Sequence, residues 1–172
     1  GRAIAIELTS RGYETIYIHS SQITPIPGVQ NVEFTTSSEL LTKINEHIIE
    51  TDYLFMTAAV ADFTVDKESG KISRDSGNIQ LNLIPNIDLI KSVKQNNKDV
   101  VTIAFSAQIN DDLNFDKIKR KNCDYLVINN ILDNSFGSDL NKIRIINKNE
   151  LVYESDQKLK SDIAYELLDV LL

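Results

Sequence analysis

Four basic side chains crowd into residues 117–121, which read Lys-Ile-Lys-Arg-Lys. Lys117 and Lys121 are four positions apart, so they share one helix face and repel each other by about 0.2–0.5 kcal/mol in an isolated helix. Such a lysine pair can bind a polyphosphate, whose negative charge offsets the repulsion. The alternative is a solvated face, because cations are stabilised near the C-terminus of a helix by its dipole. In both interpretations Lys119 and Arg120 point elsewhere.

The composition limits the classes of function. The chain has 172 residues, of which 42% are hydrophobic and 25% charged, and its formal net charge is -7. This charge argues against binding to nucleic acids or anionic membranes, and no stretch reaches the roughly 18 apolar residues of a membrane span. A single cysteine, Cys123, excludes an internal disulfide and suits the cytoplasm. With His19 and His47 as its two histidines, the chain is a poor candidate for a histidine-rich metal centre.

Alternating helix and strand patterns predict an α/β fold with a Rossmann-like, doubly wound, mostly parallel sheet. The apolar runs at 51–60, 99–107 and 123–130 are typical of strands that are buried on both faces of such a sheet. Helices are expected at 112–122 and at 156–172, and Leu159 belongs to the apolar stripe of the second. Two antiparallel hairpins are expected as additions, a polar one at 71–84 and a terminal one at 142–155. The polar hairpin interrupts the alternation, so we expect it to project as a flap or a dimer contact.

The chain opens on a helix pattern from Ala3 to Leu8 rather than on a strand. A βαβ protein normally has a strand and a loop that lead into its first helix, and this loop often contacts phosphate groups. We therefore expect residues 1–172 to form a single domain that lacks its first strand and loop.

Three of the expected strands end in candidate binding residues. In an open α/β sheet, ligands bind at the carboxyl ends of the strands. Ala58 and Ala59 would let a planar ligand approach the backbone, and Asp62 can accept a hydrogen bond from a base or bind a cation. The other two strands end at Phe105–Gln108 and at Asn129–Asn130. The alternative is that these small residues pack under a helix and that Asp62 caps a turn.

Six blocks of sequence, in order, resemble the phosphopantothenate–cysteine ligase family, the synthetase part of the bacterial bifunctional coenzyme A biosynthesis flavoprotein. The blocks are AAVADF (58–63), GKISR (70–74), NIDLI (86–90), AFSAQ (104–108), KIKRKNCDYLVINN (117–130) and FGSDLNKIRII (136–146). Together they extend along nearly the whole chain. The resemblance implies a Rossmann-like fold, a homodimer, and a flavin-dependent decarboxylase that is fused to the domain or associated with it.

The resemblance also implies an amide-forming ligase of coenzyme A biosynthesis, with 4′-phosphopantothenate, L-cysteine and CTP as substrates. The pantothenate carboxylate attacks CTP to give an acyl-cytidylate and pyrophosphate, and the cysteine amine then displaces CMP. Mg²⁺ is expected to bridge the nucleotide phosphates, although the sequence does not fix its protein ligands. AAVADF resembles the CTP-using bacterial branch of the family more than the eukaryotic one.

The roles of family residues carry over by position. Lys117 and Lys121 match the triphosphate-binding lysines, Lys71 matches the flap lysine needed in turnover and is the catalytic candidate, and Phe105 matches the aromatic residue beside the nucleotide. The elements that resemble the cytidine-binding ones are Asp62 and the backbone around Ile87, Asp88, Leu89 and Ile90. The strand-end residues Ala58 and Ala59 complete the nucleotide-binding set, and the candidates for substrate binding are Asn129 and Asn130.

The sequence departs from the family pattern in three places. The family's Gly-Phe-Ala-Ala-Glu-Thr is here 104–109, so Gln108 puts an amide where the family has a carboxylate. Its Pro-Asp-Ile is here 87–89, with the proline displaced to Pro85. An Asn-rich, Ser-Ser-Gly loop that contacts the acyl-cytidylate precedes the position of Gly1 in the family. We therefore expect residues 1–172 alone to bind nucleotide weakly and to turn over poorly.

Two other functions stay open. A non-catalytic Rossmann-like module for a dinucleotide would place an acidic residue at the end of the second strand, but that strand ends at His19-Ser20-Ser21, which counts against NAD. An interaction or dimerisation domain would use the 71–84 hairpin, and its basic helix would only be solvated. Stabilisation by CTP, by NAD or by neither would distinguish these functions.

Overall fold

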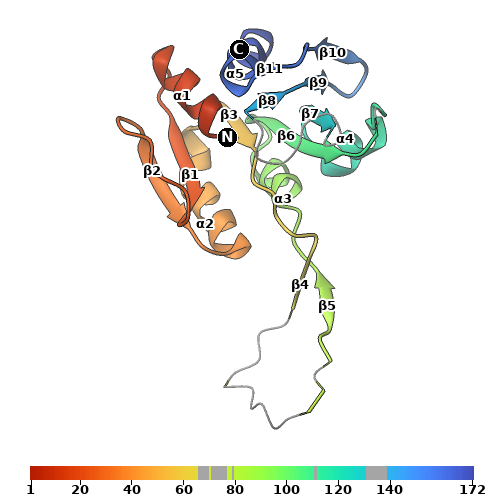
Figure 1. Cartoon of the computed structure of the whole chain (residues 1–172). Coiled ribbons are helices and arrows are strands. Elements are labelled where there is room, and N and C mark those ends of the chain that lie inside the picture. Colours follow the sequence, from red (N-terminus) through yellow and green to blue (C-terminus); the bar gives the residue numbers. More distant parts are fainter. Residues whose placement is uncertain (66–69, 71–76, 79, 111, 131–138) are drawn as a thin grey trace.

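The computed structural model describes residues 1–65, 70, 77–78, 80–110, 112–130 and 139–172. Helices and strands alternate along most of the chain (Figure 1). The helices are α1 (Arg2–Ser10), α2 (Ser37–His47), the short η1 (Ile48–Glu50), α3 (Leu89–Asn96), α4 (Phe115–Lys121) and α5 (Lys160–Leu171). The strands are β1 (Ile16–Ser20), β2 (Gln30–Phe34), β3 (Tyr53–Met56), β4 (Phe63–Val65), β5 (Leu83–Pro85), β6 (Val101–Gln108), β7 (Tyr125–Asn130), β8 (Leu140–Asn141), β9 (Ile143–Ile146), β10 (Leu151–Glu154) and β11 (Lys158–Leu159).

The central sheet has five strands in the order β10-β9-β7-β6-β3. Strands β3, β6 and β7 are parallel, whereas β9 and β10 are antiparallel to their neighbours. β1 and β2 form a separate parallel pair, and in the described residues no hydrogen-bond ladder joins β1 to β3. The predicted α/β fold with a mostly parallel sheet is confirmed. That the domain lacks a first strand stays a prediction.

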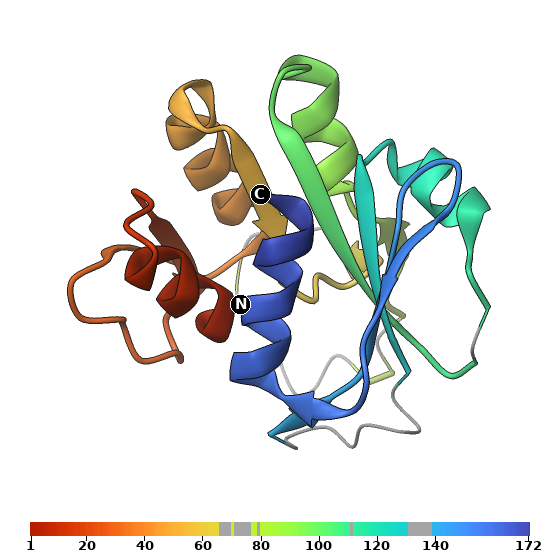
Figure 2. The same ribbon diagram turned by 90° about the horizontal axis from the view of Figure 1, so that it is seen from above.

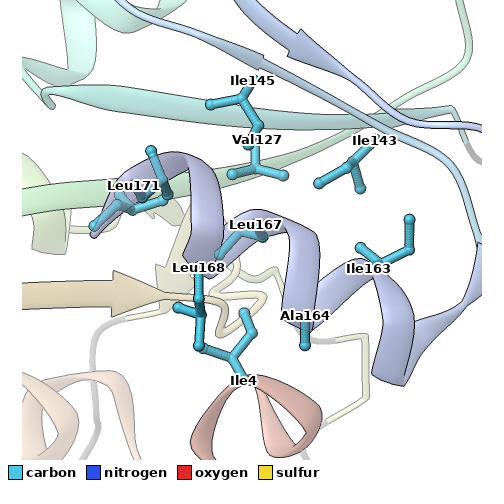
Figure 3. Packing of buried hydrophobic residues seen from close by; sticks show 10 residues of the cluster. Ile4, Val127, Ile143, Ile145, Ile163, Ala164, Leu167, Leu168 and Leu171 are labelled. Atoms are coloured by element: carbon cyan, nitrogen blue, oxygen red, sulfur yellow. The ribbon is translucent and has the colours of Figure 1, made fainter. Parts of the chain in front are cut away.

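Helices cover both faces of the sheet (Figure 2). On one face, Ile4 of α1 and Leu168 of α5 belong to a core cluster that includes Val127 and Ile145 of the sheet (Figure 3). On the other face, Ile118 of α4 is fully buried in a second cluster, and a third cluster joins α2 and α3. This two-sided covering explains why the sheet strands read as continuous apolar runs.

Three predicted elements are shorter in the structure. The run at 51–60 is a strand only to Met56. The helix expected from residue 112 begins at Phe115, because the Asn114 side chain accepts a hydrogen bond from the Lys117 N–H and so caps it. The helix expected from residue 156 begins at Lys160, because β11 pairs with β8. The prediction that Leu159 belongs to the buried stripe of this helix is wrong, because Leu159 lies in β11 and is 49% exposed.

The two predicted hairpins have different outcomes. The terminal hairpin is confirmed as β9 and β10, and its turn is held by the Asn147 Oδ1 atom, which accepts hydrogen bonds from the N–H groups of Asn149 and Glu150. Most of the turn expected within 71–84 lies outside the described residues. What the structure describes is an antiparallel pair of β4 and β5, the β4–β5 arm, which extends away from the body of the molecule (Figure 1).

No helix within the described residues is both long enough and apolar enough to cross a membrane.

Candidate functional site

The candidate site lies at the carboxyl ends of β6 and β7. These strands run parallel in a register that puts Ala107 beside Asn129 and Gln108 beside Asn130. Side chains alternate between the two faces of a strand. Ala104 and Ser106 therefore point to the face that α4 covers, where Ala104 belongs to the cluster around Ile118. The ends of β6 and β7, which the sequence indicated as two separate candidate sites, are thus neighbours.

Lys117 reaches back from the first turn of α4 to the end of β6. Its ammonium group donates a hydrogen bond to the Ser106 Oγ atom at 2.7 Å. Ser106 is 3% exposed, so this contact holds the lysine head at the edge of the sheet. The Gln108 side chain also donates to the Ser106 Oγ atom, at 3.3 Å. The Lys117 ammonium forms no ion pair among the described residues.

Lys121, one helical turn further along α4, reaches the start of α3. Its ammonium group lies 3.2 Å from the Asp88 Oδ2 atom. The other carboxylate oxygen of Asp88 accepts a hydrogen bond from the Lys91 N–H at 3.3 Å, which caps α3. Both members of the lysine pair are therefore partly buried and hydrogen-bonded, whereas Lys119 and Arg120 are exposed. The pair is therefore not on a wholly solvated helix face, and that it binds a polyphosphate stays a prediction.

The electrostatic environment of Lys117 suits an anionic ligand. Burial lowers the pKa of the Lys117 ammonium below its ordinary value, and the positive charges of Lys121 and Arg120 lower it further. The carboxylate of Asp62 acts in the opposite direction and raises this pKa, so it lies close enough to influence the lysine. A bound anion would stabilise the protonated form of Lys117 and reduce the repulsion between the cations of α4.

The segment after β3 forms another side of the site. Ala58, Ala59 and Asp62 are exposed there. The Asp62 carbonyl oxygen accepts a hydrogen bond from the Asn86 N–H at 2.8 Å, and the Asn86 side chain donates to the carbonyl of Ala61 at 3.0 Å. These bonds tie the Asp62 segment to the residues that lead into α3, so Asp62 and Asp88 are held on neighbouring segments.

The amino end of α1 also reaches this part of the sheet. A Cβ atom on Gly1 would lie 2.6 Å from the Oγ1 atom of Thr57, the residue that directly follows β3. A side chain at Gly1 would therefore force Thr57 to move, and the helix could not approach β3 so closely. The amino end of α1 therefore lies at the carboxyl end of β3.

The remaining predicted site residues lie in varied surroundings. Phe105 packs partly against the cluster beneath α1 and α5, on the face opposite to Ser106, and its role beside a nucleotide stays a prediction. Ile87 is 48% exposed, but Leu89 and Ile90 are buried in the core, so only their backbone atoms can meet a ligand. Lys71 lies outside the described residues.

Sequence reasoning missed two contacts, that between Ser106 and Lys117 and that between Asp88 and Lys121. The side of the sheet on which Ser106 lies could have been predicted, because side chains alternate along β6 and so put Ser106 and Phe105 on opposite faces. The Cys123 side chain is buried, and burial raises the pKa of its thiol to about 11, so the thiol is structural rather than a reactive nucleophile. In the described ranges, no group of three or more His, Cys, Asp or Glu side chains is arranged to hold a metal.

Comparisons with known proteins agree with this description. The family model for the DNA/pantothenate metabolism flavoprotein C-terminal domain matches residues 1–172. The Coenzyme A biosynthesis bifunctional protein CoaBC of Borreliella burgdorferi is 31% identical over 150 residues, which cover 84% of this chain and 38% of that protein. A Cysteine/Cysteine sulfinic acid decarboxylase from an unknown prokaryotic organism is 29% identical over 181 residues, covering 100% of this chain and 50% of that protein.

A solved structure shares the fold. The crystal structure of the C-terminal domain of Coenzyme A biosynthesis bifunctional protein CoaBC has a TM-score of 0.78 at 23% identity, and the match covers 99% of this chain and 81% of that one. The chain spans half the length or less of the two curated relatives above. The resemblance found from the six sequence blocks is thus confirmed, and by the match over residues 1–172 the chain belongs to the DNA/pantothenate metabolism flavoprotein C-terminal domain family.

Proposed function

We propose that this domain is the ligase that joins 4′-phosphopantothenate to L-cysteine in coenzyme A biosynthesis, with CTP as the activating nucleotide. Membership of the family and the CoaBC relative support the class of reaction. The observation that carries the proposal is the position of the lysine pair. The ammonium groups of Lys117 and Lys121 lie at the end of β6 and at the start of α3, next to the segment that bears Asp62.

In the first chemical step, a carboxylate oxygen of 4′-phosphopantothenate attacks the α-phosphorus of CTP. The bond from this phosphorus to the bridging oxygen breaks, and pyrophosphate leaves. The lysine pair holds the phosphate tail and neutralises the charge that builds up on the leaving group. This role requires positioned cations rather than a protein nucleophile, which agrees with a site that presents lysines and a buried, unreactive thiol at Cys123.

In the second step, the cysteine amine attacks the acyl carbon of the acyl-cytidylate. The carbon–oxygen bond to CMP breaks, the amide forms, and the amine loses a proton to a base or to solvent. We assign the acyl substrate to Asn129 and Asn130, at the end of β7, because side-chain amides can donate and accept hydrogen bonds. Lys71 keeps its proposed role as the flap lysine that acts during turnover.

Mg²⁺ fits this site as a companion of the nucleotide. The described residues offer no cage of three or more acidic or histidine ligands, whereas Asp62 presents an exposed carboxylate close to Lys117. Mg²⁺ is commonly held by one or two carboxylates together with substrate phosphates. The metal would supply further charge neutralisation on the phosphates, with Asp62 as its candidate protein ligand.

Thermal unfolding in the presence of CTP, ATP or NAD, each with Mg²⁺, tests the choice of ligand. A ligand that binds only the native state raises the unfolding temperature, and the rise grows with the ratio of its concentration to its dissociation constant. We expect CTP to give the largest rise, and product analysis to detect 4′-phosphopantothenoylcysteine when both acceptor substrates are added. Stabilisation by NAD alone would instead support a dinucleotide module.

We further propose that the domain is a homodimer through the β4–β5 arm. Phe63 pairs with Pro85 and Val65 pairs with Leu83, so these four residues lie on one face of the arm. Phe63 is 56% exposed and Leu83 is 61% exposed, which leaves an apolar surface in contact with water. A second copy of the same arm would cover it, and the 71–84 segment keeps its proposed place in this contact.

Replacing Leu83 with lysine should therefore convert the dimer to a monomer. The substitution puts a charge on the apolar face of the arm, and two such charges would meet across a symmetric interface. Sedimentation equilibrium should show at least a tenfold weaker dimer, corresponding to about 1.4 kcal/mol. Thr64→Ser is the matched control, because Thr64 pairs with Ile84 on the opposite face and should leave the dimer intact. A Leu83→Lys protein that stays dimeric would refute this interface.

The length of the curated relatives supports a further partner. This chain spans half of one relative and a smaller part of the other, and one of the two is named as a decarboxylase. We propose that a flavin-dependent decarboxylase is fused to the ligase domain or associated with it. Such a pair would act in the cytoplasm, with the product of the ligase as the substrate of the decarboxylase.

A further inference from the structure

We propose that Ser106 is a phosphate-binding residue. Its hydroxyl oxygen positions the Lys117 ammonium, and its hydroxyl group donates a hydrogen bond to the anion that Lys117 binds. The neutral Gln108 leaves both of these donors available to the anion. The inference rests on the proposed nucleotide-dependent function and adds binding roles for two residues. It starts from a trio of side chains at the end of β6.

The hydrogen bonds within this trio leave one donor over. The Ser106 Oγ atom accepts one bond from the Lys117 ammonium at 2.7 Å and another from the Gln108 amide at 3.3 Å. A hydroxyl oxygen has two lone pairs and one proton, so both acceptor positions are taken and the proton remains. In the part of the chain that the structure describes, no acceptor is found for that proton. Ser106 is 3% exposed, so solvent is a poor substitute.

A buried donor without an acceptor destabilises a native protein, unless a ligand atom accepts its hydrogen bond. The Lys117 ammonium has three protons, of which one is used by Ser106. The remaining lysine protons and the serine proton therefore converge on one region at the end of the sheet. Three donors around a point, with a second ammonium from Lys121 on the same helix face, form the kind of arrangement that binds phosphate oxygens.

Because Gln108 is neutral, the trio keeps the positive charge of Lys117. The related family pattern has a carboxylate at this position, and a carboxylate would accept the Ser106 proton and form an ion pair with Lys117. The amide does neither, because it donates to Ser106 and carries no charge. The lowered pKa of Lys117 fits this picture, since burial and the charges of Lys121 and Arg120 act on it without a carboxylate on β6 to oppose them. The opposing negative charge comes from Asp62, while Asp88 faces Lys121.

The test compares CTP binding, with Mg²⁺, in the full-length gene product and in three variants by calorimetry. Ser106→Ala removes the donor and the lysine contact, so the dissociation constant should rise about tenfold or more. Gln108→Glu should weaken binding to a similar extent, and the loss of affinity at alkaline pH should move to higher pH, because the new carboxylate raises the pKa of Lys117. Ser155→Ala is the matched control: Ser155 is also 3% exposed, and within the described residues its hydrogen bonds go to the backbone of Ile143.

The outcomes separate this inference from the proposed function. Weaker binding in Ser106→Ala and Gln108→Glu, with a change of less than about twofold in Ser155→Ala, supports it. If the unaltered protein binds CTP but both variants bind within about twofold of it, the inference is overturned and the ligase proposal stands. If the unaltered protein does not bind CTP, both are overturned. Should Ser106→Ala fail to fold, the Gln108→Glu affinity and pH profile decide the question.

Discussion

The Lys117→Ala protein should bind CTP about 10- to 100-fold more weakly than the unaltered protein. The substitution removes an ammonium group that lies at the end of β6 and makes no ion pair within the described residues. A hydrogen bond to a charged group contributes about 1.5–3 kcal/mol, and each 1.4 kcal/mol corresponds to a factor of ten in affinity. Calorimetric titration with CTP and Mg²⁺ measures this change directly.

Lys119→Ala is the control for this experiment. It removes the same charge from the same helix, but Lys119 is exposed and does not face the strand ends. A general loss of positive charge would weaken binding equally in both variants and would contradict the specific role of Lys117. Affinity should also fall as the pH rises through the pKa of Lys117. Because burial lowers this pKa, the fall should begin at a lower pH than for an ordinary lysine.

The Leu168→Ala protein should lose about 2–5 kcal/mol of its free energy of unfolding. Leu168 is fully buried, with 0% exposure, and lies in the cluster that joins α5, α1 and the sheet (Figure 3). Removing three carbon atoms there eliminates buried apolar surface and leaves a cavity that the rigid sheet cannot fill. Urea denaturation followed by circular dichroism measures the change.

Leu172→Ala provides the matched control for the core. It is the same substitution at the end of the same helix, but Leu172 is 40% exposed. We expect its free energy of unfolding to change by less than about 1 kcal/mol, because less apolar surface leaves water there in the native state. Equal losses in the two variants would show that the cluster under α5 does not stabilise the domain as described.

Much of the fold could be predicted from the sequence because local patterns of apolar residues indicate which segments form strands and helices. The apolar run before Ser106 and the one before Asn129 indicated buried parallel strands, and β6 and β7 confirm both. Element ends were harder, because they depend on neighbours. Leu159 fits a helical stripe by spacing, but its pairing with Leu140 makes it part of a strand, and no local pattern shows that partner.

The candidate site could be predicted in part for the same reason. The spacing of Lys117 and Lys121 fixed their common helix face, but not what that face meets. Their partners, Ser106 and Asp88, lie 11 and 33 positions away in sequence and come together only when β6, α3 and α4 pack. The face to which Phe105 points could have been read from strand alternation. The Asp88 contact could not, because it depends on the packing of two helices.

A crystal structure of the protein with CTP and Mg²⁺ tests the central claim most directly. The account predicts that phosphate oxygens of the nucleotide lie within hydrogen-bond distance of the Nζ atoms of both Lys117 and Lys121, with the Lys121–Asp88 contact loosened. A triphosphate bound elsewhere, with no phosphate oxygen within hydrogen-bond distance of either Nζ atom, would contradict it.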